Sequence, residues 1–484
     1  MNDIIVMKFG GTSVKDAKAM SSVLDIIKKR RKAHSVIVLS ACSGITDKLI
    51  SITNVSIQSV NIAYSILDEI YEHHKNLIVN LIKYDININS AFYYLDSFYS
   101  ELKELINGIN ILGECTEKSY NTIVSKGELL STFIFYVASK ERELNSFLLD
   151  SREFILLNKI GFDIEISFKN IDKLSSYIRD YHYIIMQGFI ASNSYNETAS
   201  LGRGGSDYTA ALIGNAIDAK EIQIWTDVDG ILTTDPKIVH TAKTIPAMSF
   251  SEVRTLSFYG AKVLHPDTIK PALTKEIPVW VKNTFFPDKP GTIISNCISR
   301  NQHIITSIHL NSNCLLLYYN NNFSNYNNAD SFKINELLNL LDCMVFFSSQ
   351  NANNSLHMIK PKNANQILTD TLDTLGYDYV YIDLICLCGD SLQSIVHPIP
   401  PISDLGSRHI IACEHKNYKN QYAGDFSTLH PMVSSGLIAK ITAIAEQFGL
   451  YALLFGASAN SFLVGVKQGS GEECLRALHR LCFE

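Results

Sequence analysis

Two glycine-rich segments combine glycines with charged and hydroxyl side chains, and each follows an apolar run. The first is KFGGTS at residues 8–13. Glycines let backbone amides approach a phosphate closely, and Lys8 could offset the negative charge that builds on a phosphoryl group during its transfer. Taken alone, this segment is more typical of a strand end with a solvent-exposed lysine, so the chemistry depends on what accompanies it.

The second segment is GRGGSD at residues 202–207. Arg203 can grip a carboxylate or phosphate with two hydrogen bonds, while Ser206 and the backbone amides add further donors. Asp207 places an acid at a predicted helix start. A structural role is also open, because Asp207 or Ser206 could be the N-cap and stabilise the helix by about 1 kcal/mol. Capping and chemistry are compatible. A Rossmann fingerprint is disfavoured because position 207 is Asp, and a P-loop because no Gly-Lys dipeptide occurs.

A calcium loop, a metalloprotease motif and a serine hydrolase motif are each disfavoured, because the sequence lacks the residues that they require at the required spacing. WTDVDG at residues 225–230 opens like a calcium loop, but the twelfth position counted from Asp227 is Ile238 and not an acid. Neither H-E-x-x-H nor G-x-S-x-G occurs. His73 and His74 lie in a polar helical stretch, which predicts solvated side chains. No dedicated metal cage is visible, and phosphoryl transfer remains the favoured chemistry.

The elements around the first segment form a strand–helix–strand unit. An apolar run at 4–7 predicts a buried strand, and Ser13 is a candidate N-cap for a helix through Arg31. A second strand at 35–39 ends in the small-residue loop 40–44. Such a unit implies a parallel sheet, and ligands bind such sheets at the carboxyl ends of the strands.

The pattern continues along the chain. Residues 51–150 lack proline and predict a mostly helical region. Further predicted elements are a strand at 183–186, a helix at 207–217, a strand at 221–225 and a last strand at 277–281, with a boundary near 298. Beyond it, the polar tract 320–330 reads as a loop or disordered insertion. The chain then predicts a helix at 436–449, strands at 450–455 and 461–466, and a helix at 471–481.

Length and composition exclude several classes of protein. The 484 residues correspond to about three domains, and 46% hydrophobic with 19% charged residues excludes wholesale disorder. The net charge of −6 leaves no generic basic surface for nucleic acid. No apolar run approaches the ~20 residues of a membrane span, and no secretory signal is evident. Ten cysteines without a CxxC pair indicate reduced, mostly buried thiols, so we expect a cytoplasmic protein.

Seven motifs together resemble one family. In order they are KFGGTS (8–13), SACSGIT (40–46), KGELLS (126–131), QGFI (187–190), LGRGGSDYT (201–209), WTDVDG (225–230) and YGAKVLHP (259–266). This set is similar to aspartokinases, particularly the monofunctional lysine-sensitive type, over about the first 295 residues. Any one motif would be weak, whereas seven in order are highly specific.

The resemblance implies both a fold and an activity. The fold would be an α/β parallel-sheet sandwich of the amino-acid-kinase type with helices on both faces, followed by two small α+β (ACT, ferredoxin-like) modules. The expected divisions are a catalytic domain at 1–298, a first ACT-like module at 299–400 and a second at 401–484. The activity would be transfer of the ATP γ-phosphate to the side-chain carboxylate of L-aspartate. That reaction is the first step in the synthesis of lysine, threonine, methionine and diaminopimelate. Mg²⁺ would be bound mainly by the nucleotide phosphates.

Residue roles follow from the matching motifs. The resemblance makes Lys8 and Asp207 catalytic. Substrate-binding positions would be Ser40, Thr46, Glu128, Arg203 and Ser206, with Glu128 facing the amino group and Arg203 a carboxylate. ATP-binding positions would be Lys8, Gly10, Gly11, Thr226, Asp227, Leu232, Lys237, Lys262 and Val263. Leu232 replaces a tyrosine and Lys237 an arginine that the family often carries, which could retune ATP binding.

The carboxyl-terminal part resembles the regulatory modules unevenly. LFGASAN at 454–460 and the ending at 478–484 look like the second module, but the first has no clear counterpart of the Ser-x-Gly-Phe-Leu effector loop. The resemblance implies an amino-acid effector, with lysine the candidate, and a homodimer through the ACT modules. Two other functions stay open: a sister kinase acting on glutamate, N-acetylglutamate or a nucleotide monophosphate, and a non-catalytic amino-acid sensor.

Overall fold

The computed structural model describes residues 4–30, 33–160, 163–260, 264, 266–296, 305–320, 334, 336–338, 340–350, 354–362, 366–389, 431–455 and 460–484. By its internal contacts the chain divides into two units. The first comprises Met1–Leu232, Thr244–Ser257 and Lys262–Ser299, and the second comprises Thr233–Lys243, Phe258–Ala261 and Arg300–Glu484. The polar tract at 321–330 lies outside the described residues.

An eight-stranded sheet forms the centre of the first unit, in the order β10-β12-β11-β9-β1-β2-β6-β3. Its strands are β1 (Ile4–Phe9), β2 (His34–Leu39), β3 (Ser146–Leu149), β6 (Tyr183–Gln187), β9 (Glu221–Thr226), β10 (Ala247–Met248), β11 (Val279–Asn283) and β12 (Thr292–Ile294). The strands from β3 to β11 are parallel, and β12 runs antiparallel to β11. The five predicted strands are confirmed in β1, β2, β6, β9 and β11. The other three were not predicted: β3 lies within the region 51–150 predicted to be mostly helical, and β12 follows the strand predicted to be last.

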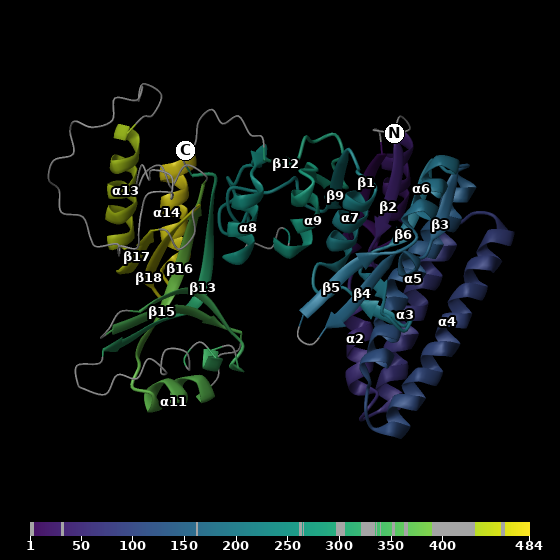
Figure 1. The fold of residues 1–484 in the computed structure, drawn as a ribbon, viewed down its shortest axis with the longest axis horizontal. Helices are drawn as coiled ribbons and strands as arrows, with labels where there is room; N and C mark the ends of the chain where they lie inside the picture. The colour runs from purple at the N-terminus through teal and green to yellow at the C-terminus, as the bar shows by residue number, and fades with distance from the viewer. Residues whose placement is uncertain are drawn as a thin grey trace. The chain divides into compact units, whose positions relative to one another are not determined.

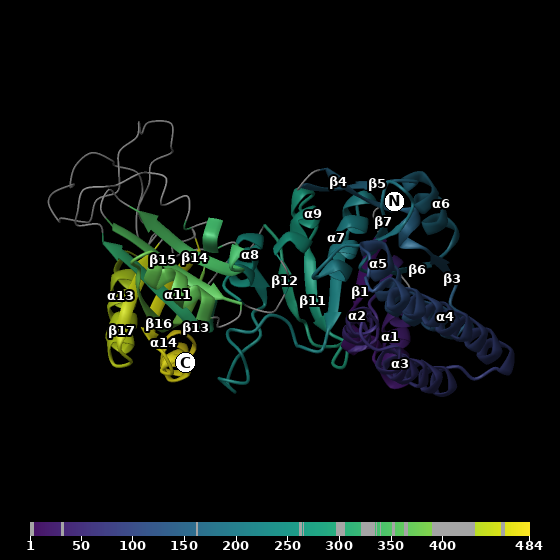
Figure 2. The ribbon, with the colours of Figure 1, turned by 90° about the horizontal axis from the view of Figure 1, so that it is seen from below.

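Helices cover both faces of this sheet, as the apolar strand sequences require. Ile5, Met7 and Phe9 of β1 pack into one core with the helices α1 (Ala17–Lys29), α2 (Ile45–Val55), α3 (Val60–Leu81), α4 (Asp85–Leu112) and α5 (Glu117–Glu141). Figure 2 shows α1 to α4 on one side of the sheet and α7 (Gly205–Ala216) and α9 (Lys270–Thr274) on the other. The predicted parallel-sheet sandwich is therefore confirmed.

Two local predictions in the first unit are wrong. The N-cap of α1 is Asp16, whose Oδ1 accepts a hydrogen bond from the Ala19 amide at 2.8 Å. Ser13 instead lies in a buried 3-10 helix, η1 (Gly11–Val14), because the chain makes a tight turn before α1 begins. His74 is fully buried, with Nδ1 2.8 Å from the Ile70 carbonyl oxygen, because α3 packs against α1, α2, α4 and α5.

A second, smaller sheet in the first unit was not predicted. It has the order β5-β4-β7-β8, with β4 (Ile155–Ile160), β5 (Asp163–Phe168), β7 (Ile190–Ser192) and β8 (Thr198–Ser200). The β4–β5 hairpin projects beside the main sheet in Figure 1. The remaining helices of this unit are η2 (Ser151–Glu153), α6 (Ile171–Asp180), α8 (Phe250–Phe258) and η3 (Pro266–Ile269). Strands β7 and β8 connect the end of β6 to the glycine-rich segment before α7.

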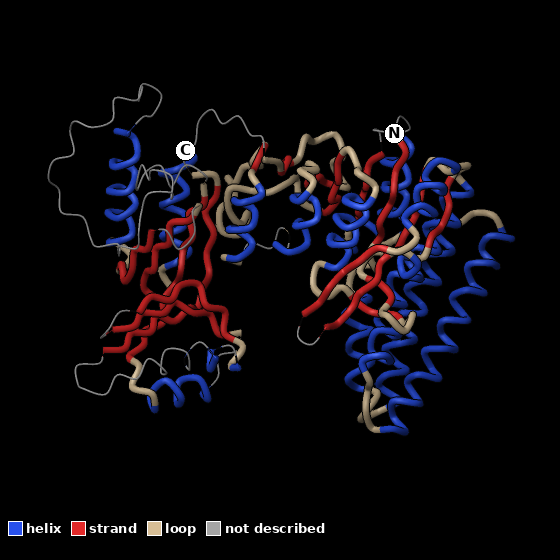
Figure 3. The backbone as a smooth tube through the Cα atoms, in the orientation of Figure 1, coloured by secondary structure: helices blue, strands red, loops and turns tan. Residues whose placement is uncertain are grey.

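The second unit contains one six-stranded antiparallel sheet, in the order β14-β15-β13-β16-β18-β17. Its strands are β13 (Ser307–Asn320), β14 (Cys343–Gln350), β15 (Asn354–Pro361), β16 (Asp378–Cys388), β17 (Leu450–Phe455) and β18 (Ser461–Lys467). Its helices are α11 (Gln366–Thr374), α13 (Pro431–Glu446) and α14 (Gly471–Phe483). Figure 3 shows α11 near one end of this sheet and α13 and α14 near the other.

The long strands β13 and β16 run through the whole of this sheet. Ile308 of β13 joins the core beneath α13 and α14, whereas Leu315 and Leu317 join the core beneath α11. The predicted helix–strand–strand–helix ending is confirmed in α13, β17, β18 and α14. The predicted division into modules at residue 400 falls outside the described residues and stays a prediction, as does the boundary near 298.

None of the cysteines that the structure describes forms a disulfide. Cys42, Cys314, Cys343, Cys386, Cys388 and Cys474 are buried, and Cys115 and Cys482 are partly buried. The prediction of reduced, mostly buried thiols is confirmed for these eight residues. In the same part of the chain, no helix is both long and apolar enough to cross a membrane.

One buried carboxylate anchors α14 to the sheet of the second unit. Asp383 of β16 is 4% exposed. Its Oδ2 accepts hydrogen bonds from the Gly469 amide at 2.8 Å and the Gly471 amide at 3.0 Å, and its Oδ1 from the Asn313 amide at 3.3 Å. A side chain at Gly471 would put its Cβ 2.7 Å from Asp383 Cβ, so only glycine permits this approach.

Replacing this carboxylate should destabilise the second unit. In Asp383→Ala three amides lose their acceptor, which should cost about 2–3 kcal/mol of unfolding free energy. Because Trp225 and Trp280 both lie in the first unit, urea unfolding followed by far-UV circular dichroism should shift more than unfolding followed by tryptophan fluorescence. Lys362→Ala, which removes an exposed ion pair with Asp342, is the control and should change little. An unchanged dichroism midpoint in Asp383→Ala would contradict the anchoring role.

Candidate functional site

The loops that follow the parallel strands meet at the carboxyl edge of the main sheet. The strand order reverses at β1, which has β2 on one side and β9 on the other, and such a switch point leaves a crevice for ligands. A cavity of about 600 Å³ lies at this edge. Its lining comes from the loops after β1, β2 and β6, from α2 and α5, and from the glycine-rich segment before α7.

An ion pair links the central strand to α7. Lys8 Nζ lies 2.6 Å from Asp207 Oδ1, and the two side chains are only 12% and 16% exposed. Met7 and Phe9 point into the core beneath α1 to α5, so strand alternation turns Lys8 toward the face that α7 covers. The pair therefore forms one wall of the cavity and holds a cation at the carboxyl end of β1.

Glycines allow the start of α7 to come this close. A Cβ at Gly188 would lie 2.5 Å from Ser206 Cβ, and a Cβ at Gly205 would lie 2.8 Å from the Phe189 ring. Gly204 is the N-cap of α7, with φ of 72°, and no side chain caps the helix. The alternative that Ser206 or Asp207 serves as the cap is therefore wrong, because both residues lie inside the helix, which begins at Gly205.

A buried acid lies on α5, on the other side of the sheet. Glu128 is 3% exposed, and its Oε2 has no hydrogen-bond partner in the part of the chain that the structure describes. Burial raises the pKa of Glu128 to about 8, although the Ala41 and Glu128 backbone amides favour the ionised form. Without a ligand, Glu128 is therefore mostly protonated at neutral pH.

Close packing fixes α5 against the loop after β2. Ser131 Oγ donates a hydrogen bond to the Ser40 carbonyl oxygen at 2.7 Å. A Cβ at Gly127 would lie 2.8 Å from Ala41 Cβ, so glycine is needed at this crossing. These contacts hold Glu128 at a set position relative to the Ser40 loop.

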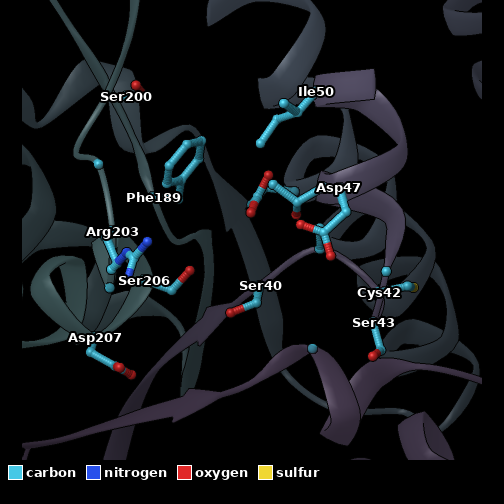
Figure 4. A pocket seen from close by; sticks show the side chains of 18 of the residues that line it. Ser40, Cys42, Ser43, Asp47, Ile50, Phe189, Ser200, Arg203, Ser206 and Asp207 are labelled. Carbon is cyan, nitrogen blue, oxygen red and sulfur yellow. The ribbon is translucent and has the colours of Figure 1, made fainter. Parts of the chain in front are cut away.

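Figure 4 shows how the side chains face one another. Arg203, Ser206 and Asp207 lie on one side of the cavity, Asp47 lies on the opposite side, and Ser40 lies between them. Arg203 is exposed and makes no ion pair with any described residue. Cations on one side and carboxyl groups on the other suit a ligand that itself carries both a negative and a positive group.

The structure brings all of the predicted substrate and catalytic residues together. The predicted residues that line the cavity are Lys8, Gly11, Ser40, Thr46, Glu128, Arg203, Ser206 and Asp207. Gly10 precedes this lining, and its amide donates a hydrogen bond to the Trp225 carbonyl oxygen at 3.0 Å. The individual roles given to these residues remain predictions.

The structure brings fewer of the predicted ATP-binding residues to the cavity. Thr226 ends β9 at the same edge of the sheet and Asp227 follows it, but neither lines the cavity. Leu232 belongs to the first unit and Lys237 to the second. Lys262 and Val263 lie outside the described residues.

Several lining residues had no role assigned from the sequence. They are Asp47, Ile50, Tyr120, Phe189 and Ser200, together with residues 41–44 of the Ser40 loop. Phe189 lies in the QGFI motif and Asp47 directly follows SACSGIT, so their motifs carried a signal. Ser200 directly precedes LGRGGSDYT and so had the same kind of signal. Tyr120 gave none, because only the packing of α5 brings it to the cavity.

Comparison with known proteins identifies relatives across the chain. Residues 3–283 match the amino acid kinase family. The chain is 28% identical to lysine-sensitive aspartokinase 3 of Escherichia coli, and the alignment covers 100% of both chains. It is 37% identical to chloroplastic aspartokinase 1 of Arabidopsis thaliana over 64% of this chain, which corresponds to about half (55%) of that protein's length.

Solved structures of one relative resemble the whole chain. E. coli aspartokinase III in complex with lysine and aspartate has a TM-score of 0.76 at 25% identity, covering 100% of both chains. The same protein in complex with aspartate and ADP has a TM-score of 0.75 at 25% identity, covering 99% of this chain and 100% of that one.

The raised pKa of Glu128 predicts a specific pH dependence of stability. Because its folded pKa of about 8 lies above its ordinary value of 4.5, the unfolded chain loses this proton first as pH rises. The wild-type protein should therefore lose stability relative to Glu128→Gln between pH 5 and pH 9, by at most about 4 kcal/mol. Chemical denaturation of both proteins across this range measures the difference.

A matched variant separates this effect from a general change of charge. Glu72→Gln removes a carboxylate that is 56% exposed, and its stability difference from the wild type should stay nearly constant with pH. A Glu128→Gln curve parallel to that of the wild type would show that Glu128 ionises normally in the folded chain.

Proposed function

Because the chain belongs to the amino acid kinase family, we propose that it is an aspartate kinase. It transfers the γ-phosphate of ATP to the side-chain carboxylate of L-aspartate, giving 4-phospho-L-aspartate and ADP. The observation that carries the proposal is one cavity holding both the Lys8–Asp207 ion pair and the buried carboxyl of Glu128, whose Oε2 has no hydrogen-bond partner among the described residues. The similarity along the whole chain to an aspartokinase solved with aspartate and ADP supports it.

The cavity offers a partner for each charged group of aspartate. Arg203 forms no ion pair within the part of the chain that the structure describes, so its guanidinium can bind the α-carboxylate through two hydrogen bonds. Glu128 accepts the α-ammonium, and the arrival of that cation favours its ionised form. Ser40, Thr46 and Ser206 add hydroxyl groups along the same lining. The side-chain carboxylate is left directed toward Lys8.

The transfer step needs positioning more than proton abstraction. An ionised carboxylate is already a nucleophile at neutral pH, so no general base is required. Its oxygen forms a bond to the γ-phosphorus as the bond from that phosphorus to the β–γ bridging oxygen breaks and ADP leaves. Lys8 offsets the charge on the transferring group, and Asp207 orients Lys8 by the 2.6 Å ion pair.

In this proposal ATP binds at the loops after β1 and β9. Gly10 and Gly11 follow the end of β1, with Gly11 in the lining of the cavity, and Thr226 and Asp227 lie at the end of the adjacent strand. Among the described residues, no group of three or more His, Cys, Asp or Glu side chains could hold a metal ion. Mg²⁺ is therefore expected to take most of its ligands from the phosphates, whose charge it neutralises.

Regulation and assembly belong to the second unit in this proposal. The relative from E. coli is named lysine-sensitive and was solved with lysine bound. We extend this to an amino-acid effector, with lysine as the candidate, bound by ACT modules in the second unit. The same modules would join two copies of the chain as a homodimer in the cytoplasm.

The proposal predicts a product that can be trapped chemically. With ATP, Mg²⁺ and L-aspartate, the protein should form an acyl phosphate that hydroxylamine converts to a coloured hydroxamate. Lys8→Ala and Asp207→Ala should each lower kcat by about a hundredfold or more, because charge on the transferring group is no longer offset. Lys28→Ala removes an exposed lysine of α1 and should keep wild-type activity.

The outcome also separates the alternatives. Full activity in both Lys8→Ala and Asp207→Ala would remove these residues from the site. Hydroxamate formed from glutamate or N-acetylglutamate but not from aspartate would indicate a sister kinase. Amino-acid binding without any ATP turnover would indicate a sensor.

Glu128 predicts that aspartate binding releases a proton. With a pKa of about 8, this carboxyl is mostly protonated at pH 7, and the incoming ammonium should displace the proton. Calorimetric titrations of aspartate in two buffers of different ionisation enthalpy measure the number of protons released. Glu128→Gln should abolish the release and weaken aspartate binding. Equal heats in both buffers for the wild-type protein would mean that Glu128 does not face the ammonium.

A further inference from the structure

The end of β11 contains a buried asparagine that uses both ends of its amide. Asn283 is 4% exposed. Its Nδ2 donates hydrogen bonds to Asp229 Oδ1 at 2.7 Å and to the Asp227 carbonyl oxygen at 3.4 Å. Its Oδ1 accepts hydrogen bonds from the amides of Phe285 at 2.8 Å and Phe286 at 3.3 Å. One side chain therefore holds the loop after β9 against the loop after β11.

The next residue holds the loop after β1. Thr284 is 1% exposed, and its Oγ1 lies 2.6 Å from Ser13 Oγ in η1. The Thr284 amide donates a hydrogen bond to the Thr226 carbonyl oxygen at 2.8 Å. Asn283 and Thr284 together bind the two loops between which the nucleotide is proposed to lie.

The chemistry of this contact requires an amide. The carboxylate of Asp229 needs a donor, while the two phenylalanine amides need an acceptor, and asparagine supplies both in one side chain. Lys289 Nζ also lies 2.5 Å from Asp229 Oδ2, and this contact, followed by that of Asn283, keeps the pKa of Asp229 below its ordinary value. Lys289 is half exposed, so the buried Asn283 is the stronger constraint.

Neither residue reaches the substrate cavity. Asn283 and Thr284 do not line it, and they touch Asp227, Thr226 and Ser13 instead of Lys8, Arg203 or Glu128. Any effect of Asn283 on the reaction must therefore pass through the backbone of the loop that follows β9. Loops held in place before binding lose less freedom when a ligand arrives.

We infer that Asn283 is a positioning residue for ATP, which fixes the Asp227–Asp229 loop in its nucleotide-binding conformation without touching aspartate. The inference rests on the proposed function for the identity of the nucleotide and adds a residue that the seven motifs did not include. The contacts of Asn283 lie on the nucleotide side only, so its replacement should affect the binding of ATP and not that of aspartate.

The test is a comparison of Michaelis constants. Asn283→Ala should raise the KM for ATP about tenfold, as expected when a loop loses two hydrogen bonds, and change the KM for aspartate less than twofold. Asn283→Asp should raise the KM for ATP further, because it sets a second carboxylate against Asp229. The double variant Asn283→Asp with Asp229→Asn exchanges donor and acceptor and should recover most of the ATP affinity.

A matched asparagine controls for loss of stability alone. Asn215 at the end of α7 donates hydrogen bonds to the Pro271 carbonyl oxygen at 2.7 Å and to Thr274 Oγ1 at 2.9 Å, away from the cavity and both loops. Asn215→Ala should lower the melting temperature and leave the ratio of the two Michaelis constants unchanged. Equal changes in both Michaelis constants for Asn283→Ala, or the same ratio change in Asn215→Ala, would overturn the inference.

Direct nucleotide binding keeps this inference separate from the proposed function. If the wild-type protein does not phosphorylate aspartate, the proposed function fails, but calorimetric titration of ADP into the wild type and Asn283→Ala still tests the residue. A weaker ADP affinity in Asn283→Ala, with recovery in the double variant, supports the positioning role. Equal affinities in the wild type and Asn283→Ala overturn it.

Discussion

The ion pair between Lys8 and Asp207 is the contact on which the rest of the site depends. It joins the carboxyl end of the central strand to the first turn of α7 across 2.6 Å, largely sheltered from solvent. Opposite charges attract more strongly there than at an open surface, because less water surrounds the pair to screen the attraction. Glycine is needed at 188 and 205 because a side chain at either position would push α7 away from the strand. It is needed at 204 because the backbone there has a positive φ.

From this contact the two halves of the cavity acquire opposite character. The α7 side carries the cations and the backbone of a glycine-rich segment, whereas the α5 side carries an acid whose burial keeps it protonated. In the proposed reaction two anions, aspartate and ATP, meet on a chain with net charge −6. Overall charge therefore says little about the ligand, because a few local cations decide which groups can approach.

The second unit follows a different construction. Its six strands form one continuous antiparallel sheet, in which β13 and β16 contribute to the cores at both ends. Strands that lie far apart in the sequence pair with one another in this sheet, as β16 does with β13 and β18. A carboxylate buried under α14 then fixes that helix to the sheet, so the unit is held together by a few specific contacts between distant segments.

The sequence by itself determined five strands of the main sheet (β1, β2, β6, β9 and β11), the helical region between β2 and β3, and the carboxyl-edge position of Lys8 and Asp207. It could do so because apolar periodicity and glycine punctuation are local properties of the chain. The family motifs added the proposed activity. Only the tertiary structure decided that Asp16 and not Ser13 caps α1, that His74 is buried, that Glu128 holds a proton, and that Asn283 joins two loops. The physical reason is that burial and hydrogen-bond partners come from segments far apart in sequence, such as the 271 positions between Ser13 and Thr284, and no local pattern records which of them meet.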